Sequence, residues 1–188
     1  MINYYYSDPH FGHENIIGFA DRPFRSSYHQ TRELIDRYAA VVTPDDLVLW
    51  LGDCFFCSAE EAQHIMQSLP GHKGLVMGNH DRKPRRMIEI GFDFVVEREM
   101  FVSLPGIDSR VKACHYPYAH YKSPDSYCPD RYLDRRPRAE RNEYLLHGHV
   151  HSTDRRQGNM LHVGVDAWDY RPVSAQALSD LINQVDKQ

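Results

Sequence analysis

The stretch Leu75-Val76-Met77-Gly78-Asn79-His80-Asp81 changes abruptly from apolar to polar side chains. Its first three residues are typical of a short buried β-strand. The glycine lets the backbone turn tightly, and the polar residues after it can bind an ion or a substrate. A polar cluster directly after a buried strand indicates an α/β protein, because functional groups of such proteins lie where strands end and loops begin.

The same change occurs at three other places in the chain. Strands are predicted over three further apolar runs, and polar residues follow each: Asp8 and His10 after residues 2–6, Asp53 after residues 46–51, and His147, His149 and His151 after residues 144–146. We therefore expect these side chains to lie at converging loops.

The remaining sequence predicts a layered α/β fold. Helices are expected over residues 28–42, 58–69 and 175–185, and the second of them begins with the capping-box pattern Ser58-Ala59-Glu60-Glu61. Further strands are expected over residues 92–96, 101–104, 110–114 and 160–163. Helices and strands alternate early and strands dominate later, which argues against a purely doubly wound sheet.

Length and composition exclude several classes of protein. The 188 residues favour one domain, residues 1–188, and 41% hydrophobic with 26% charged residues excludes a disordered chain. The 22 Lys and Arg against 26 Asp and Glu give a net charge of −4, so a generic polyanion-binding face is not expected.

Neither a membrane nor a secreted protein is expected. The apolar run at residues 47–51 is far shorter than the ~20 residues that span a bilayer, and the amino terminus has no signal-peptide pattern. The four cysteines are too few for a disulfide-stapled scaffold of this size. We therefore expect a cytoplasmic protein without a membrane partner.

The 12 histidines are an excess, and several occur in metal-ligand patterns. In Asp8-x-His10 and His149-x-His151, the two side chains lie on one side of an extended segment and can bind one ion. Oxygen and imidazole ligands without thiolate suit Mn²⁺, Fe, Zn²⁺ or Ni²⁺. Each pattern alone also occurs in ordinary loops, so the indication comes from their joint occurrence after predicted strands.

The motifs and their order resemble the calcineurin-like metallophosphoesterase superfamily. The residues that carry the resemblance are Asp8-x-His10, Gly52-Asp53, Gly78-Asn79-His80-Asp81, His115 and Gly148-His149-x-His151. The stretches 7–17, Arg22-Pro23-Phe24 and Val163-Gly164-Val165-Asp166 are similar to its small bacterial and phage branch. The resemblance implies a four-layer α/β/β/α sandwich with two mixed sheets.

The resemblance also implies a role for each motif residue. One divalent ion would be held by Asp8, His10, Asp53 and His151, and a second by Asp53, Asn79, His115 and His149. Mn²⁺ is favoured, with Fe, Zn²⁺ or Ni²⁺ as alternatives. Such ions would activate a bridging hydroxide as the nucleophile, while His80 assists the leaving group and Asp81 orients His80.

The expected activity is hydrolysis of small phosphomono- or phosphodiesters, with nucleotide derivatives as candidate substrates. Two alternatives stay open: a non-catalytic binding or scaffold protein on the same fold, and a nuclease or nucleic-acid processing enzyme. The second is motivated by tyrosines and arginines in residues 116–146, including Arg131 and Arg135. We favour a substrate-shaping lid or insert there, because the interval's charge is nearly balanced.

Other reactive residues rank lower. Cys54-x-x-Cys57 has the spacing of a redox or zinc pair, but no second pair accompanies it, so packing is favoured. His13 is a candidate for facing the substrate, and His147 for supporting a ligand. The role of His162 stays open.

Overall fold

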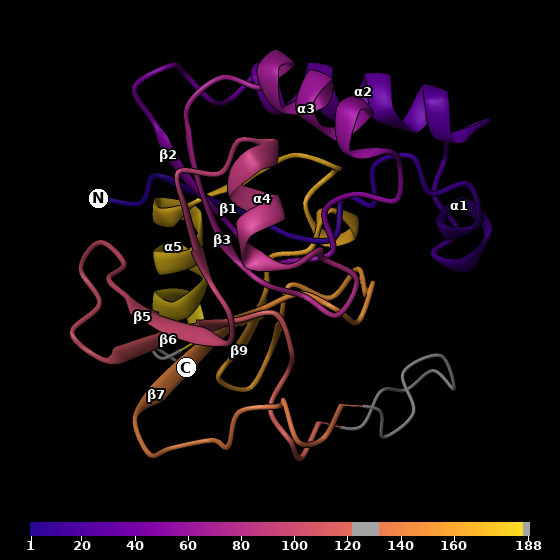
Figure 1. Ribbon diagram of the computed structural model, residues 1–188. Helices are drawn as coiled ribbons and strands as arrows, with labels where there is room; N and C mark the ends of the chain where they lie inside the picture. Colours follow the sequence, from indigo (N-terminus) through magenta and orange to yellow (C-terminus); the bar gives the residue numbers. More distant parts are fainter. Residues whose placement is uncertain (122–131, 186–188) are drawn as a thin grey trace.

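The computed structural model describes residues 1–121 and 132–185 and contains two mixed five-stranded sheets (Figure 1). The first sheet has the order β10-β1-β2-β3-β4, formed by Val173–Ser174, Tyr4–Tyr6, Leu47–Trp50, His72–Val76 and Phe94–Val96. The second has the order β5-β6-β7-β9-β8, formed by Glu99–Val102, Arg110–Cys114, Glu143–His147, Met160–His162 and Arg156–Gln157. The expected α/β class with two mixed sheets is confirmed.

The central strands of both sheets are parallel. Strands β1 to β4 run parallel and β10 pairs antiparallel with β1. In the second sheet β6, β7 and β9 run parallel, and β5 and β8 pair antiparallel at the edges. Every polar motif of the sequence follows one of these parallel strands, and a bridge between Ser7 and Gly164 joins the two sheets beside them.

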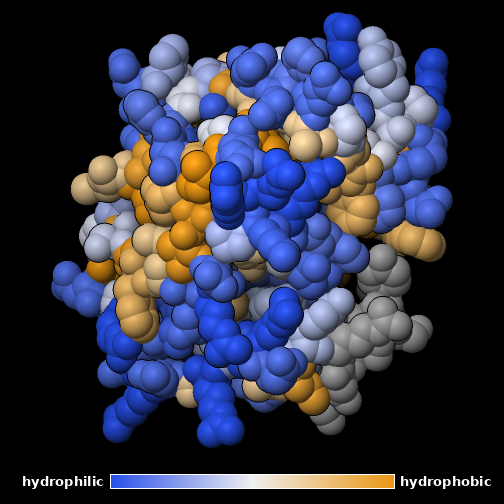
Figure 2. All heavy atoms as spheres, in the orientation of Figure 1, coloured by the Kyte–Doolittle hydropathy of each residue, from blue (hydrophilic) through white to orange (hydrophobic). Residues whose placement is uncertain are grey.

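Three helices cover the outer face of the first sheet: α2 (Ser27–Ala39), α3 (Ala59–Ser68) and α4 (Pro84–Ile90) (Figure 1). They bury Leu34, Ile65 and Met87 in one apolar cluster with Trp50 of β2. The predicted cap of α3 is present, since Ser58 Oγ accepts the Glu61 amide at 3.1 Å. In the view of Figure 2, hydrophilic side chains cover these helices, and a hydrophobic area lies to their lower left.

A second apolar cluster fills the space between the sheets. Side chains of β2 and β3, such as Leu49 and Val76, meet Leu146 and Leu161 of β7 and β9. Helix α5 (Ala175–Val185) completes this core along one edge. Arg156 of β8 donates to the carbonyls of Leu181 and Ile182, which ties the helix to the second sheet.

The covering of the outer face of the second sheet differs from the α/β/β/α sandwich that the sequence led us to expect. Tyr116, Tyr118 and Tyr121 are buried there against Leu145 and Met160. Within residues 1–121 and 132–185, this face carries the tyrosine segment instead of a helix. Cys128 and Arg131, in the middle of the interval 116–146, lie outside the described residues.

The short elements are the main departures from the predicted secondary structure. The predicted strand 110–114 and helix 175–185 have the observed bounds, and the other predicted elements are present with shifted ends. The sequence did not predict α1 (Asn15–Phe19), α4, β8, β10 or the 3₁₀ turn Val165–Ala167. Among the described residues, no helix is both long enough and apolar enough to span a membrane.

Candidate metal centre

The carboxyl ends of the parallel strands bring six of the seven expected ligands into two groups. Asp8, His10 and His151 form one group, and Asp53, His115 and His149 form the other. Within each group, one ligand atom per residue lies within 4.8 Å of the others. Both groups contain a carboxylate and two imidazoles, a donor set that suits a divalent transition metal.

Most of these residues have an unusual backbone conformation. Five of the seven expected ligands have positive φ angles between 49° and 71°: Asp8, His10, Asp53, His149 and His151. A left-handed conformation is uncommon outside glycine and occurs preferentially at functional sites. The local backbone is thus held in a form that aims these side chains at one place.

In the first group, two buried polar atoms face the centre without a hydrogen bond. Asp8 Oδ1 and His10 Nε2 have no hydrogen-bond partner within the described part of the chain. His10 Nε2 lies 4.0 Å from Asp8 Oδ1 and 3.7 Å from Asp53 Oδ2. Leaving such groups unpaired is costly, and an ion between them would remove the cost.

The second group has a fixed imidazole at its centre. His115 Nδ1 lies 2.6 Å from the Leu51 carbonyl, which can only accept a hydrogen bond, so this nitrogen carries the proton. In the neutral ring, Nε2 then presents its lone pair to Asp53 Oδ2 at 3.5 Å and Asn79 Oδ1 at 3.2 Å. Asn79, the seventh expected ligand, therefore joins this group. Lone pairs that face one another at these distances repel each other unless a cation lies between them.

The pKa values of three candidate ligands are shifted in different directions because their surroundings differ. Burial and the neighbouring His115 lower the pKa of His149 to about 2, and burial with His151 holds the pKa of His10 well below its usual range. Burial would also lower the pKa of His115, but Asp53 and Asp8 raise it. Neutral imidazole is the form that binds a metal.

Two glycines leave the space that these ligands occupy. A Cβ atom at Gly78 would lie 2.2 Å from Asp53 Oδ1, and one at Gly148 would lie 2.1 Å from Asp8 Oδ2. Any other residue at either position would displace a carboxylate of the centre. The glycines of the Gly-Asn-His-Asp and Gly-His-x-His motifs thus allow the backbone to pack directly against the two carboxylates.

A buried ion pair between Arg22 and Asp166, for which the sequence indicated no role, supports the first group. The Arg22 guanidinium bonds Asp166 at 2.8 and 3.0 Å and donates to the Asp8 carbonyl at 2.8 Å. Asp166 Oδ2 lies 3.1 Å from His151 Nδ1. Burial would raise the pKa of Asp166, but Arg22 and His151 hold it at about 2. Asp166 thereby fixes the orientation of a candidate ligand.

Replacement of Arg22 should destabilise the fold strongly. Arg22→Ala would leave the buried Asp166 carboxylate without its counter-charge, which typically costs about 3–5 kcal/mol. Urea unfolding of the metal-free protein measures the loss. Arg37→Ala is the matched control, because its partner Asp169 is exposed and such a pair contributes about 0–1 kcal/mol. Equal losses in the two variants would contradict this role of Arg22.

The two expected catalytic residues have different surroundings. His80 is exposed at the rim, its ring centroid 4.8 Å from Phe56 and 6.1 Å from His10. Asp81, expected to orient His80, instead accepts hydrogen bonds from backbone amides. The donors are the Gly78 amide at 2.7 Å, the Asp53 amide at 3.1 Å and the Cys54 amide at 3.0 Å. Asp81 therefore shapes the loops, and its expected role in orienting His80 stays a prediction.

His13, a candidate for facing the substrate, contacts the candidate ligand His10. Its Nδ1 lies 3.1 Å from His10 Nδ1, so one of the two nitrogens donates to the other. Its ring stacks on Phe56 with a centroid distance of 4.1 Å and an interplanar angle of 7°. If His10 binds an ion through Nε2, its Nδ1 proton has His13 as acceptor.

The remaining candidates lie outside the two groups. His147 and His162 pair across β7 and β9, are buried, and their ring centroids are 5.3 Å apart. Cys54 is a buried free thiol packed in the core, which agrees with a packing role. From the interval 116–146, Tyr116 and Tyr132 contact the His149 ring, at centroid distances of 5.1 and 5.8 Å.

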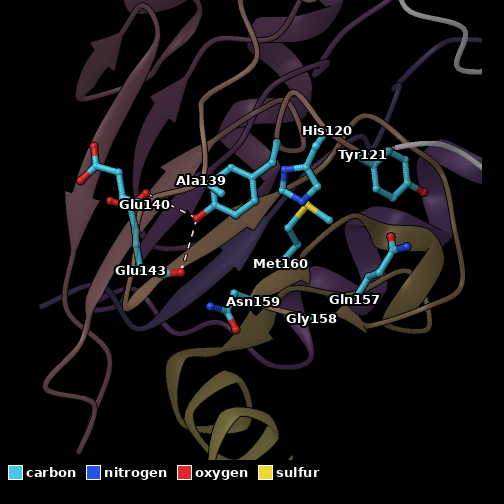
Figure 3. Close-up of a pocket in the computed structure, with 10 residues that line it drawn as sticks. His120, Tyr121, Ala139, Glu140, Glu143, Gln157, Gly158, Asn159 and Met160 are labelled. Carbon is cyan, nitrogen blue, oxygen red and sulfur yellow. Dashed lines mark hydrogen bonds between the residues drawn. The ribbon is translucent and has the colours of Figure 1, made fainter.

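A pocket of about 510 Å³ lies against the outer face of the second sheet, apart from the ligand groups (Figure 3). Tyr118, His120 and Met160 line it, and Tyr118 hydrogen-bonds Glu143. The acidic groups at this pocket are already paired: Glu140 with Arg110 at 2.9 Å and Glu143 with Lys112 at 3.2 Å. None of the expected ligands lines the pocket.

Fold and site together define an α/β protein with two mixed sheets and a clustered aspartate–histidine centre at its strand ends. The Gene 66 protein of Mycobacterium phage L5 is 30% identical over 97% of this chain and 94% of its own length, and the chain belongs to this family. The uncharacterized protein MJ1445 of Methanocaldococcus jannaschii is 25% identical over 96% of this chain and 91% of its own length.

A solved structure has a similar fold along the whole chain. The protein of unknown function AQ665 from Aquifex aeolicus matches with a TM-score of 0.71 and 29% identity, covering 95% of this chain and 97% of that one. No family model matches the chain. The two-sheet α/β arrangement is therefore shared with an experimentally determined structure.

Proposed function

We propose that this protein is a dinuclear-metal phosphoesterase of the metallophosphoesterase type, hydrolysing phosphomono- or phosphodiesters. The observation that carries the proposal is the position of Asp53 Oδ2. It lies 3.7 Å from His10 Nε2 and 3.5 Å from His115 Nε2, so one carboxylate oxygen faces both ligand groups. A shared carboxylate between two ligand sets suits two ions in one centre.

The residues present fit two divalent ions. One would be held by Asp8, His10, Asp53 and His151, and the other by Asp53, Asn79, His115 and His149. The buried unpartnered atoms Asp8 Oδ1 and His10 Nε2 support this, because each lacks what an ion would provide. When bound, two such ions would supply an activated water and positive charge for in-line displacement at phosphorus.

The chain's own residues supply orientation and a proton. Ser7 Oγ donates to Asp8 Oδ2 at 2.6 Å and the His149 amide donates to the same oxygen at 3.0 Å, which leaves Oδ1 for the centre. His80 stands at the exposed rim, with its amide bonded to Asp53 Oδ1 at 3.0 Å. From there its imidazole can protonate the departing oxygen, an effect typically worth about 10²–10⁴-fold.

A substrate panel tests the proposal. The metal-stripped protein is reloaded with Mn²⁺, Fe²⁺, Ni²⁺, Zn²⁺ or Mg²⁺ and assayed on aryl mono- and diesters, nucleotides and 2′,3′-cyclic nucleotides. We expect hydrolysis of at least one ester class with Mn²⁺ and none after chelation. Tight binding of two ions without hydrolysis of any ester would favour the scaffold alternative.

The presence of every expected ligand argues against the scaffold alternative. A non-catalytic protein has no need to keep both ligand groups, five left-handed backbone positions and an exposed His80 together. The nuclease alternative rests on the tyrosines and arginines of the interval 116–146, and three of those tyrosines, Tyr116, Tyr118 and Tyr121, are buried against the second sheet and not exposed for base stacking. We therefore keep small phosphoesters as the primary substrates.

A further inference from the structure

A pocket of about 380 Å³ adjoins the second ligand group. Asn79 and Tyr116 line it, and Asn79 Oδ1 is 3.2 Å from His115 Nε2. The Tyr116 ring meets the His115 and His149 rings edge-on, at centroid distances of 4.8 and 5.1 Å. The pocket thus begins where the candidate metal centre ends, and a molecule bound at the centre can extend into it.

Three cationic side chains from separate segments line this pocket. Lys83 precedes α4, Arg98 lies between β4 and β5, and Arg135 lies in the later part of the interval 116–146. Within the described residues, neither Lys83 nor Arg98 forms an ion pair. The fold therefore brings these charges together from three places, unlike the charges along a solvated helix face.

The acidic side chains at the pocket cancel only part of this charge, since two carboxylates stand against three cations. The Asp81 carboxylate is held by three backbone amides, at 2.7, 3.0 and 3.1 Å, and keeps its charge. Glu97 remains as a second carboxylate against Lys83, Arg98 and Arg135. A locally cationic pocket in a chain with a net charge of −4 is a specific feature of this place.

We propose that this pocket binds a second phosphate of the substrate, next to the one that is hydrolysed. The inference rests on the proposed function. Guanidinium and ammonium groups pair with phosphate oxygens, and Arg98 and Arg135 can do so with two hydrogen bonds each. The volume of about 380 Å³ is ample for a phosphate together with part of the group that carries it.

Two matched substrates test the inference. Thymidine 5′-(4-nitrophenyl phosphate) carries one phosphate, and its 3′-phosphorylated form carries a second one with the same leaving group. With the Mn²⁺-loaded protein we expect the second phosphate to lower KM about tenfold, as for one charge-assisted contact, while kcat changes little. Because the cations are exposed, 0.5 M NaCl should remove most of this difference.

Two variants locate the effect. Arg98→Gln and Lys83→Gln should reduce the ratio of the two KM values, that is, the preference for the ester with two phosphates, several-fold. Both variants should leave hydrolysis of the single-phosphate ester unchanged. Arg32→Gln, an exposed arginine on α2, is the matched control and should keep the full preference. Calorimetry with thymidine 3′,5′-bisphosphate and thymidine 5′-phosphate gives the same comparison without turnover. Equal KM and affinity for the two ligands in the wild type would overturn the inference.

The source of the second phosphate has its own test. A nucleotide bearing an extra phosphate and a short oligonucleotide present the same chemistry, so a dinucleotide and an octanucleotide are compared with the thymidine pair. A fall in KM that is complete with one added phosphate indicates small nucleotides as substrates. A KM that continues to fall as the oligonucleotide grows longer indicates nucleic acid. If the esters with one and two phosphates are hydrolysed with equal KM, this inference alone is disproved. If no ester is hydrolysed in a metal-dependent way, the proposed function is disproved.

Discussion

Asp53→Ala should lose both metal ions from one substitution. Asp53 Oδ2 is the only carboxylate oxygen that we assign to both ligand groups, at 3.7 and 3.5 Å from the nearest imidazole nitrogens. Removing it leaves each group one ligand short and takes away the negative charge between two cations. Elemental analysis after dialysis should find about two ions per chain in the wild type and close to none in the variant.

The control and the folding check make this result interpretable. Asp36→Ala removes an exposed carboxylate from α2 and should keep both ions. Burial, together with the neighbouring Asp8 and Asp81, raises the pKa of the Asp53 carboxyl, so its negative charge is unfavourable in the metal-free fold. The metal-free Asp53 variant should therefore remain folded. Two ions per chain in folded Asp53→Ala would disprove the bridging role.

His80→Ala should keep both ions and lose most turnover. His80 is exposed and belongs to neither ligand group, so its removal costs little stability and no metal ligand. A lost general acid typically lowers the rate by about 10²–10⁴-fold. Steady-state kcat on an aryl phosphate ester, measured beside metal content, gives the comparison, with exposed His64→Ala as the matched control.

The leaving group distinguishes proton donation from simple substrate binding. An alkyl ester releases a strongly basic oxygen and should suffer more from His80→Ala than an ester of 4-nitrophenol, whose anion leaves without a proton. An equal fall in kcat for the two esters would indicate that His80 positions the substrate instead. Wild-type kcat on the aryl ester would remove the catalytic assignment altogether.

Much of the centre could be predicted because its ligands are local in sequence. Asp8-x-His10, Gly52-Asp53 and Gly148-His149-x-His151 each follow a strand that the apolar pattern indicates, and parallel strands carry such loops to one edge. Recognising the strands therefore favoured the expectation that the motifs meet, and the division of their residues into two ligand sets was implied by the family resemblance. The long helices were predicted for a related reason, since their apolar residues repeat over several turns.

The supporting contacts could not be predicted in this way. Arg22 and Asp166 are 144 residues apart, and no local pattern indicates that they pair. Asp81 is next to His80 in sequence, yet its carboxylate turns to the amides of its own loop and of the loop after β2, which only the fold brings within reach. Elements such as β8 and β10 have two residues each and are too short to show a period.

The most direct test of the central claim is a metal titration of activity. Metal-stripped protein receives increasing Mn²⁺, and the initial rates of hydrolysis of 4-nitrophenyl phosphate and bis(4-nitrophenyl) phosphate are measured against Mn²⁺ bound per chain. We predict a rate that rises with occupancy and stops rising at two ions per chain, with Asp53→Ala inactive throughout. Two ions bound with no hydrolysis at any occupancy, or full activity with none bound, would contradict a dinuclear phosphoesterase.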